Sequence, residues 1–198
     1  MKKISKVIIP SLIALLVIIT VIPSANATVF SYKRATGVFN AYYDDSVAAK
    51  GYTTQFDWAR SKWSGISSKV SIGKTNNATT STDQYYVGTT FVPKLYGETN
   101  FFKKTGSYVD PNISNWDYSA VVIYHNNLVK DGLDNDTNMK NTVTHEVGHS
   151  LGLAHTNEIN NTLKAFSIMT DGSDSFKNRN VTSPSDYDEG ELKYKWGN

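Results

Sequence analysis

The segment from His145 to His155 constrains this chain more than any other part of its sequence. Its eleven residues read HEVGHSLGLAH, and Glu146 directly follows the first histidine. Because successive helical residues turn by about 100°, His145 and His149 lie on one helical face, and both imidazoles can reach the same metal ion. The glycine and the third histidine make the pattern much more specific than its first five residues alone.

Gly152 allows the third histidine to join the other two. His155 would lie out of reach if the helix continued straight, but glycine accepts positive φ, ends the helix and turns the chain back. The spacing therefore predicts three imidazole ligands and one open position for water, which is typical of a catalytic zinc rather than a structural one. Glu146 is expected beside the metal, where a carboxylate can accept a proton from bound water.

Other interpretations of this motif stay open. The simplest is a helix with surface histidines, although three of the four histidines of the chain fall in the motif. A second is a secreted binding protein that keeps the site without turnover, and a third is a structural zinc protein. The intact Glu146 disfavours the second, because a binding protein needs no general base. The open ligand position and the lack of cysteine disfavour the third.

The first 27 residues have the composition of a secretory signal peptide. Three lysines precede an apolar run over residues 7–22, and Ala25-Asn26-Ala27 fits an A-x-A cleavage site. A membrane anchor is the alternative, but the run is short for a membrane span and the cleavage site follows it at once. We therefore expect a signal peptide over residues 1–27, one folded domain over residues 28–198, and a secreted, extracellular protein without stable membrane association.

Charge and cysteine content exclude further classes of protein. The chain has 20 basic and 18 acidic residues, but three basic residues lie in the predicted signal peptide, so the remainder is close to neutral. A nearly neutral domain gives no indication of nucleic acid binding. The chain has no cysteine, so disulfides cannot stabilise it and no thiolate can block a zinc ion. The few residues between Thr28 and the first expected strand leave no room for a folded pro-domain.

Four segments are rich in β-forming residues. The most apolar of them, residues 118–124, is expected at the centre of a sheet, because a strand buried on both faces has few polar residues. Residues 100–103 could continue a strand or begin a loop. The other predicted strands cover residues 38–43, 69–74 and 84–92.

Three helices are expected, and with the strands they indicate an α+β fold. The first carries an aromatic stripe that should pack on the sheet, and the second carries the histidine motif after a polar, acidic loop. The last should begin with Ser183 as its N-cap, proline at its first position and an acidic residue, Asp186, three residues after the cap. The stripe consists of Tyr52, Phe56, Ala59 and Trp63, and the acidic loop covers residues 126–138. The motif helix is expected over residues 139–151, with Thr142 or Asn138 as its cap. The last helix should begin near Ser183 and Pro184 and end at Gly197.

On these residues the chain resembles the metzincin zinc peptidases, and among them the secreted, matrixin-like bacterial members. The motif from His145 to His155 carries the resemblance, and its Ser150-Leu151-Gly152-Leu153 segment is similar to the matrixin version. Downstream, Ser167-Ile168-Met169-Thr170 resembles the Met-turn, a tight turn whose methionine lies under the zinc site. The specific match is confined to about residues 144–170.

The resemblance implies a particular architecture. It is a twisted, five-stranded mixed sheet with three main helices, and a cleft separates a larger N-terminal subdomain from a smaller C-terminal one. A peptide substrate lies extended in that cleft and pairs with an antiparallel edge strand, as in β-augmentation. Residues 84–92 and residues 101–103 are both candidates for this edge strand, and the sequence does not choose between them.

The resemblance also implies an activity, that of a monomeric zinc metalloendopeptidase acting on protein or peptide substrates. Glu146 is then the general base, and Gly152 and Met169 support the metal site. The ligands of one catalytic Zn²⁺ are His145, His149 and His155. The alternative is a non-catalytic secreted binding or effector protein with the same fold.

Three further features lie outside the shared motif. Some metzincins have a tyrosine two residues after the Met-turn methionine, whereas this chain has Asp171. His125, the fourth histidine, is more typical of a hydrogen-bonding or surface residue than of a ligand. Asp131, Asp134 and Asp136 form an acidic cluster whose oxygens would suit Ca²⁺, although their spacing differs from an EF-hand and acidic loops are usually only solvated.

Overall fold

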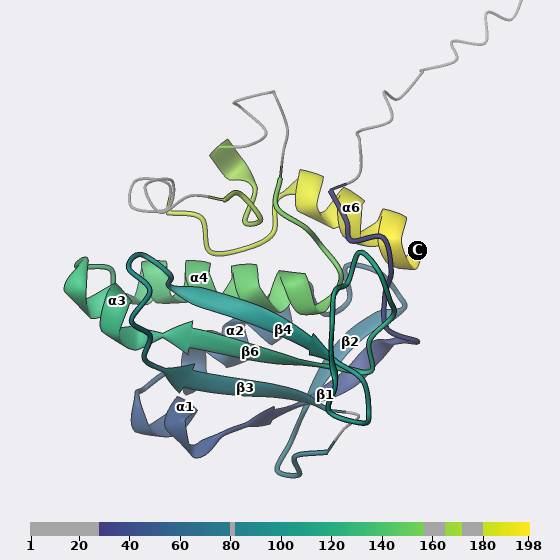
Figure 1. The fold of residues 1–198 in the computed structure, drawn as a ribbon. Coiled ribbons are helices and arrows are strands. Elements are labelled where there is room, and N and C mark those ends of the chain that lie inside the picture. The colour runs from purple at the N-terminus through teal and green to yellow at the C-terminus, as the bar shows by residue number, and fades with distance from the viewer. Residues whose placement is uncertain (1–27, 80–81, 157–164, 172–179) are drawn as a thin grey trace, which may run out of the picture.

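The computed structural model describes residues 28–79, 82–156, 165–171 and 180–198 (Figure 1). The predicted signal peptide, residues 1–27, lies outside these described residues. Among the described helices, none has the length and apolar character needed to cross a membrane.

The strands of the described residues form one mixed sheet in the order β2-β1-β3-β6-β4-β5 (Figure 1). The first four strands in this order run parallel to one another, and β4 is antiparallel to both of its neighbours. Six strands replace the expected five because the short β5 pairs with the end of β4. The bounds are Gly37–Tyr43 for β1, Val70–Thr75 for β2, Asp83–Gly88 for β3, Gly97–Phe102 for β4, Tyr108–Val109 for β5 and Tyr118–Tyr124 for β6.

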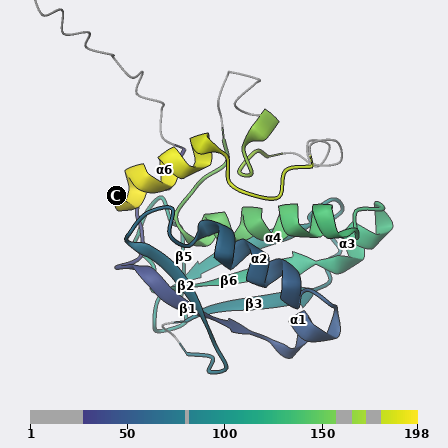
Figure 2. The same cartoon turned by 180° about the vertical axis from the view of Figure 1, so that it is seen from behind.

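The two long helices of the N-terminal part cover the same face of the sheet. Figures 1 and 2 show α2 (Thr53–Trp63) and α4 (Asp136–Ser150) side by side across it. The indole of Trp63 donates to the carbonyl of Thr144 at 2.9 Å, which joins the two helices. The shorter helices α1 (Asp45–Ala49) and α3 (His125–Lys130) follow β1 and β6 directly.

The predicted aromatic stripe of α2 forms the centre of the core. Tyr52, Phe56, Ala59 and Trp63 are all fully buried. The ring of Phe56 stacks on Tyr85 of β3 with 4.8 Å between centroids. The prediction that residues 118–124 form a central strand is also confirmed, because β6 lies between β3 and β4 and alternates buried and half-buried side chains.

The C-terminal part continues beyond α4 and ends in α6 (Asp186–Trp196), on the other side of α4 from the sheet (Figure 1). The indole of Trp196 donates to the carbonyl of Leu151 at 2.8 Å, which fixes α6 against the end of α4. A mixed α+β domain with a C-terminal part stacked on the motif helix agrees with the expected fold class.

Several predicted boundaries were wrong. The motif helix begins at Asp136, because the side chain of Asn135 caps it by accepting from the amide of Asn138 at 3.1 Å, and neither proposed cap is used. The start of the last helix moves by two residues, because Ser185 and Asp188 form a capping box in place of Ser183 and Asp186. The acidic loop after β6 begins with α3, and β3 ends at Gly88, not at residue 92.

A buried ion pair ties the N-terminal segment to the sheet. Arg34 Nη1 lies 2.6 Å from Asp83 Oδ1, and both side chains are almost completely buried. The same carboxylate oxygen accepts from the amide of Ser119 at 2.9 Å, and the second guanidinium nitrogen donates to the carbonyl of Asp117 at 3.0 Å. The pair therefore joins residues before β1 to the starts of β3 and β6.

Replacing Arg34 with methionine should destabilise the protein strongly. The carboxylate of Asp83 would remain buried without its cation, and breaking such a pair costs about 3–5 kcal/mol. Urea unfolding followed by circular dichroism measures the loss. An Arg34→Met/Asp83→Asn double variant, which removes the stranded charge, should be at least as stable as the single variant. A change within about 0.5 kcal/mol for Arg34→Met, the range of an ordinary surface substitution, would contradict the argument.

Candidate metal centre

The end of α4 turns the chain as the glycine of the motif predicted. Gly152 has a φ of 93°, in the left-handed region that other residues avoid. Its amide donates to the carbonyl of His149 at 2.8 Å, and the next amide, of Leu153, reaches the carbonyl of Gly148 at 3.2 Å. These two bonds form a Schellman motif, which satisfies the last carbonyls of the helix and directs His155 back towards it.

The three histidine side chains of the motif meet at one point. The Nε2 atoms of His145 and His149 are 3.0 Å apart, and they lie 3.1 Å and 3.2 Å from Nε2 of His155. A tetrahedral zinc with Zn–N bonds of about 2.0–2.1 Å separates its ligand nitrogens by about 3.3–3.4 Å. In the described part of the chain, these three imidazoles form a group that could hold a metal ion, and the spacing of their nitrogens fits zinc.

The outer nitrogens of two rings determine where the protons lie. His145 Nδ1 is 2.8 Å from the carbonyl oxygen of Ile168, and His149 Nδ1 is 2.8 Å from that of Leu153. A carbonyl oxygen only accepts, so Nδ1 carries the proton and donates in both rings. The Nε2 atom of each neutral ring then carries an unshared lone pair. These lone pairs point at one another, an arrangement that a cation stabilises. Burial, together with the neighbouring His145 and His155, lowers the pKa of His149 well below its usual value, which keeps that ring neutral.

The third ring has a different neighbour. His155 Nδ1 lies 3.7 Å from a carboxylate oxygen of Asp171, and both side chains are substantially exposed. Asp171 therefore occupies a place beside the outer nitrogen of a proposed ligand, where a carboxylate commonly orients a metal-bound imidazole.

Glu146 lies next to the histidines and is almost completely buried. The hydroxyl of Thr99 on β4 donates to its Oε2 at 2.9 Å. Burial, together with the nearby Glu98, raises the pKa of Glu146 to about 8, against the opposing hydrogen bond from Thr99. A cation held by the three histidines would lower this pKa again, because an opposite charge favours the carboxylate.

Strand β4 approaches this carboxylate so closely that only glycine fits at its first position. A Cβ added at Gly97 would lie 2.7 Å from Cγ and 2.9 Å from Oε1 of Glu146. Real Cβ atoms do not come this close to other heavy atoms, so any side chain here would displace the strand or Glu146.

Met169 lies directly against the motif helix, as the predicted Met-turn requires. Residues 167–170 form a turn, in which the amide of Thr170 points to the carbonyl of Ser167 at 3.4 Å. Met169 is buried, and a Cβ added at Gly148 would lie 2.4 Å from its sulfur and 2.8 Å from the ring of Trp63. Gly148 therefore lets the turn pack under the helix between the two ligand-bearing positions.

A buried carboxylate fixes this turn to the last helix. Asp188 accepts from the hydroxyl of Ser167 at 2.6 Å and from the amide of Ile168 at 2.9 Å. It is also the N3 residue in the capping box of α6, where it accepts from the amide of Ser185 at 2.8 Å. Because the carbonyl of Ile168 holds His145, Asp188 connects α6 to a metal-binding position through two hydrogen bonds.

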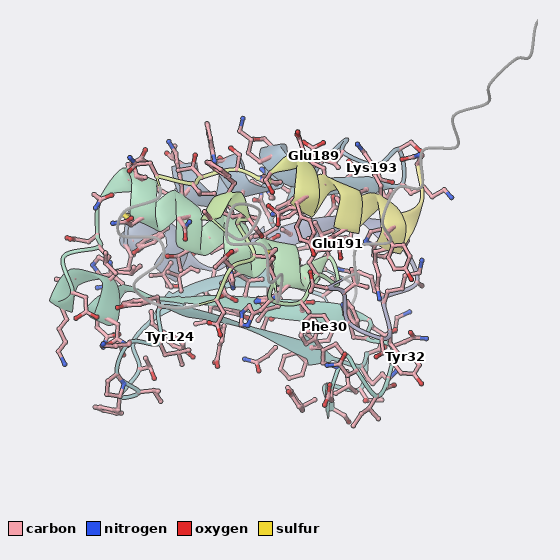
Figure 3. The ribbon with its side chains drawn as sticks, turned by 90° about the horizontal axis from the view of Figure 1, so that it is seen from above. Phe30, Tyr32, Tyr124, Glu189, Glu191 and Lys193 are labelled. Atoms are coloured by element: carbon pink, nitrogen blue, oxygen red, sulfur yellow. The ribbon has the colours of Figure 1, made fainter. Side chains whose placement is uncertain are left out.

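The segment after Thr28 supports the same site from the other side. Val29 forms an antiparallel bridge with Leu153, and the amide of Phe30 donates to the carbonyl of Gly152 at 2.9 Å. The ring of Phe30, labelled in Figure 3, lies 5.8 Å from the ring of His149 between centroids. The N-terminal segment thus holds the turn that carries His155 and borders one of the other ligands.

The site opens into a cleft between the two parts of the molecule. One wall comes from the residues before and within β4 and from α4, and the other comes from the C-terminal part. The lining residues are Lys94, Leu95, Tyr96, Gly97, Asn141, Thr142, His145 and Glu146 on the first wall and His155, Thr170 and Asp171 on the second.

The structure does not gather the acidic residues considered for calcium into a comparable group. Asp131 accepts from the hydroxyl of Tyr96 at 2.6 Å, and Asp136 accepts from Gln55 at 3.0 Å and from Lys140 at 2.6 Å. Calcium binding by Asp131, Asp134 and Asp136 therefore stays a sequence prediction. His125 lies outside the metal cluster, and its Nδ1 is 3.1 Å from the hydroxyl of Tyr52, in agreement with a hydrogen-bonding role.

Sequence reasoning missed four residues that shape the site: Gly97, Thr99, Gly148 and Asp188. Gly148 stands inside the motif, where a glycine between two helical ligands could have signalled close packing. The capping-box pattern pointed to the correct helix but to the wrong serine and aspartate. Nothing in the local sequence connects Gly97 or Thr99 to Glu146, because the contact joins residues about fifty positions apart.

The mixed sheet, the cleft and the cluster of three histidines beside a glutamate define the arrangement expected of a metzincin zinc peptidase. The sequence profile of the matrixin family matches residues 40–183. This match covers most of the chain, and the chain belongs to the matrixin family. No curated protein sequence shows significant similarity to it.

Several solved structures are similar in fold. One is a chain of the GM1-bound form of the ECX AB5 holotoxin, with 17% sequence identity, a TM-score of 0.51 and coverage of 82% of each chain. Myroilysin has 15% identity and a TM-score of 0.49, with 86% of this chain and 98% of that chain covered. High choriolytic enzyme 1, a hatching enzyme zinc-protease from the medaka fish Oryzias latipes, has 15% identity and a TM-score of 0.44, with 85% and 94% covered.

Two helical glycines provide a matched test of the packing under the motif. Alanine at Gly148 collides with Met169 and Trp63, so Gly148→Ala should lower the free energy of unfolding by about 1–3 kcal/mol. Gly190 of α6 has open space around it, and Gly190→Ala should leave stability unchanged or raise it by up to about 1 kcal/mol. Chemical unfolding of both variants measures the difference, and equal stabilities would contradict the proposed packing.

Proposed function

We propose that this chain is a secreted zinc-dependent endopeptidase that hydrolyses peptide bonds of extracellular proteins, with Glu146 as the general base. The observation that carries the proposal is the convergence of three imidazole nitrogens beside a buried carboxylate, in a cleft lined by β4, α4 and the C-terminal part. Secretion is supported by the lysines, apolar run and Ala25-Asn26-Ala27 site of the first 27 residues.

The described residues divide the chemistry between them. His145, His149 and His155 would hold the metal, and zinc bound there supplies a Lewis acid that polarises a carbonyl and lowers the pKa of a bound water to about 7. Glu146 accepts a proton from the attacking water and delivers it to the amide nitrogen as the peptide bond breaks. The low exposure of Glu146 keeps bulk water from competing for this proton.

The part of β4 that β5 leaves unpaired offers a place for the substrate backbone. Strand β3, which contains the first part of the candidate segment 84–92, lies between β1 and β6 and is not an outer strand of the sheet. Phe101 and Phe102 belong to β4 but already pair with β5. Gly97 to Asn100, beside Glu146, keep one side unpaired within the described sheet, so an extended peptide can add there by β-augmentation.

Replacing Glu146 with glutamine should abolish turnover while zinc remains bound. The amide keeps the size of the carboxyl but cannot accept the proton, and a general base contributes about 10²–10⁴-fold to the rate. Hydrolysis of a mixed peptide library by the purified protein, with metal content measured on the same samples, tests this. Cleavage at the parent rate by Glu146→Gln would show that the assigned mechanism is wrong, and no cleavage by the parent protein would favour the non-catalytic alternative.

Zinc should also stabilise the fold, because its site exists only in the folded chain. Free zinc at 100 times the dissociation constant adds about 2.7 kcal/mol to the free energy of unfolding. Thermal unfolding with and without a chelator measures this gain. His149→Ala should abolish it, whereas His125→Ala, which removes a histidine outside the cluster, should retain it. An identical response of the two variants to zinc would contradict the assigned ligand set.

A further inference from the structure

The hydroxyl of Thr99 lies on the side of β4 that faces the motif helix, within hydrogen-bonding distance of Glu146. We propose that Thr99 is a positioning residue: its hydroxyl holds Oε2 of Glu146, so that Oε1 is the oxygen that exchanges the proton. The inference rests on the proposed function of the site and deepens it, because it assigns different tasks to the two oxygens of the general base.

The hydrogen bonds around Glu146 are unequal. Thr99 Oγ1 lies 2.9 Å from Oε2 and 2.8 Å from the backbone carbonyl oxygen of the same residue. Both distances lie within hydrogen-bonding range, and the single hydroxyl proton is shared between these two acceptors, so Thr99 links the carboxylate to the helical backbone that carries it. Among the described residues, no protein donor bonds to Oε1. One oxygen is therefore fixed by the protein and the other is left for the water and the substrate.

The hydroxyl itself has little freedom. Thr99 is paired with Val121 in the ladder between β4 and the central strand β6, so its backbone is part of the rigid sheet. A β-branched side chain has restricted χ1 rotation, which fixes the direction of Oγ1. The sheet, and not the flexible end of the glutamate, thus determines where the carboxylate lies.

Gly97 closes the other side of the carboxylate. Its missing side chain leaves room for Cγ and Oε1, which a Cβ would approach within 3 Å. Gly97 and Thr99 are two positions apart on one strand, so they face the same side of the sheet. Together they form a slot that admits the carboxylate of Glu146 in one orientation.

The test compares the removal of the hydroxyl with its retention. Thr99→Val keeps the shape and removes the donor, and Thr99→Ser keeps the donor. Thr144→Val is the matched control, because Thr144 is fully buried on α4, its hydroxyl donates to the carbonyl of Thr182 at 3.3 Å, and it is not among the residues that line the cleft. Peptide hydrolysis, metal content and thermal unfolding are measured for each variant and for the parent and Glu146→Gln proteins.

We expect the kcat of Thr99→Val to fall by about 10- to 100-fold, the effect of losing a hydrogen bond to a charged group, while KM and zinc content stay near the parent values. Thr99→Ser should recover most of the rate, and Thr144→Val should keep it even if it lowers the melting temperature. A crystal structure of Thr99→Val should show the carboxylate displaced from its present position. If valine prevents folding, Thr99→Ala gives the same comparison with serine.

The possible failures are distinguishable. Suppose that the parent is active, that Glu146→Gln is inactive, and that the folded variant without the hydroxyl keeps the parent kcat. This result overturns the role of Thr99 and leaves the proposed function standing. A fall in kcat that serine does not restore, or an equal fall in Thr144→Val, also overturns it. An inactive parent protein with zinc bound overturns the proposed function itself.

Discussion

The structure of the site depends on the meeting of three imidazole Nε2 atoms, which lie 3.0–3.2 Å from one another. Backbone carbonyls of Ile168 and Leu153 hold the outer nitrogens of two rings and so point their inner nitrogens at the same place. Each carbonyl belongs to a separate turn, one after the motif helix and one before α6. The protein can bring the rings together only when both turns are in place, and a cation then removes the repulsion between the lone pairs.

Close packing around α4 also fixes the helix that carries two of the imidazoles and Glu146. Gly148 removes a side chain from the face that meets Met169 and Trp63, and Gly97 removes one from the strand that meets Glu146. The helix is therefore fixed from two directions by contacts that an added Cβ would force to shift. The buried carboxylate of Asp188 ties the turn of Met169 to the last helix, so the C-terminal part takes its position from the site.

Sequence periodicity predicted the core better than the ends of its elements. The stripe of Tyr52, Phe56, Ala59 and Trp63 and the central strand β6 follow from burial alone, and both are present. Helix starts were less predictable, because several polar residues before each helix can act as caps, and the structure used Asn135 and Ser185. The short β5 was not predicted because two residues show no periodicity.

The sequence by itself determined the three histidines, Glu146 and the turn at Gly152, because helical geometry and the freedom of glycine fix these relations within a few residues. The methionine of the later turn was expected from the resemblance to the metzincins. Only the tertiary structure decided that Thr99 and Gly97 face Glu146, that Asp188 holds the turn of Met169, and that residues 97–100 have one side unpaired within the described sheet. These contacts join segments far apart in the chain, and they depend on strand order and register, which local sequence patterns do not encode.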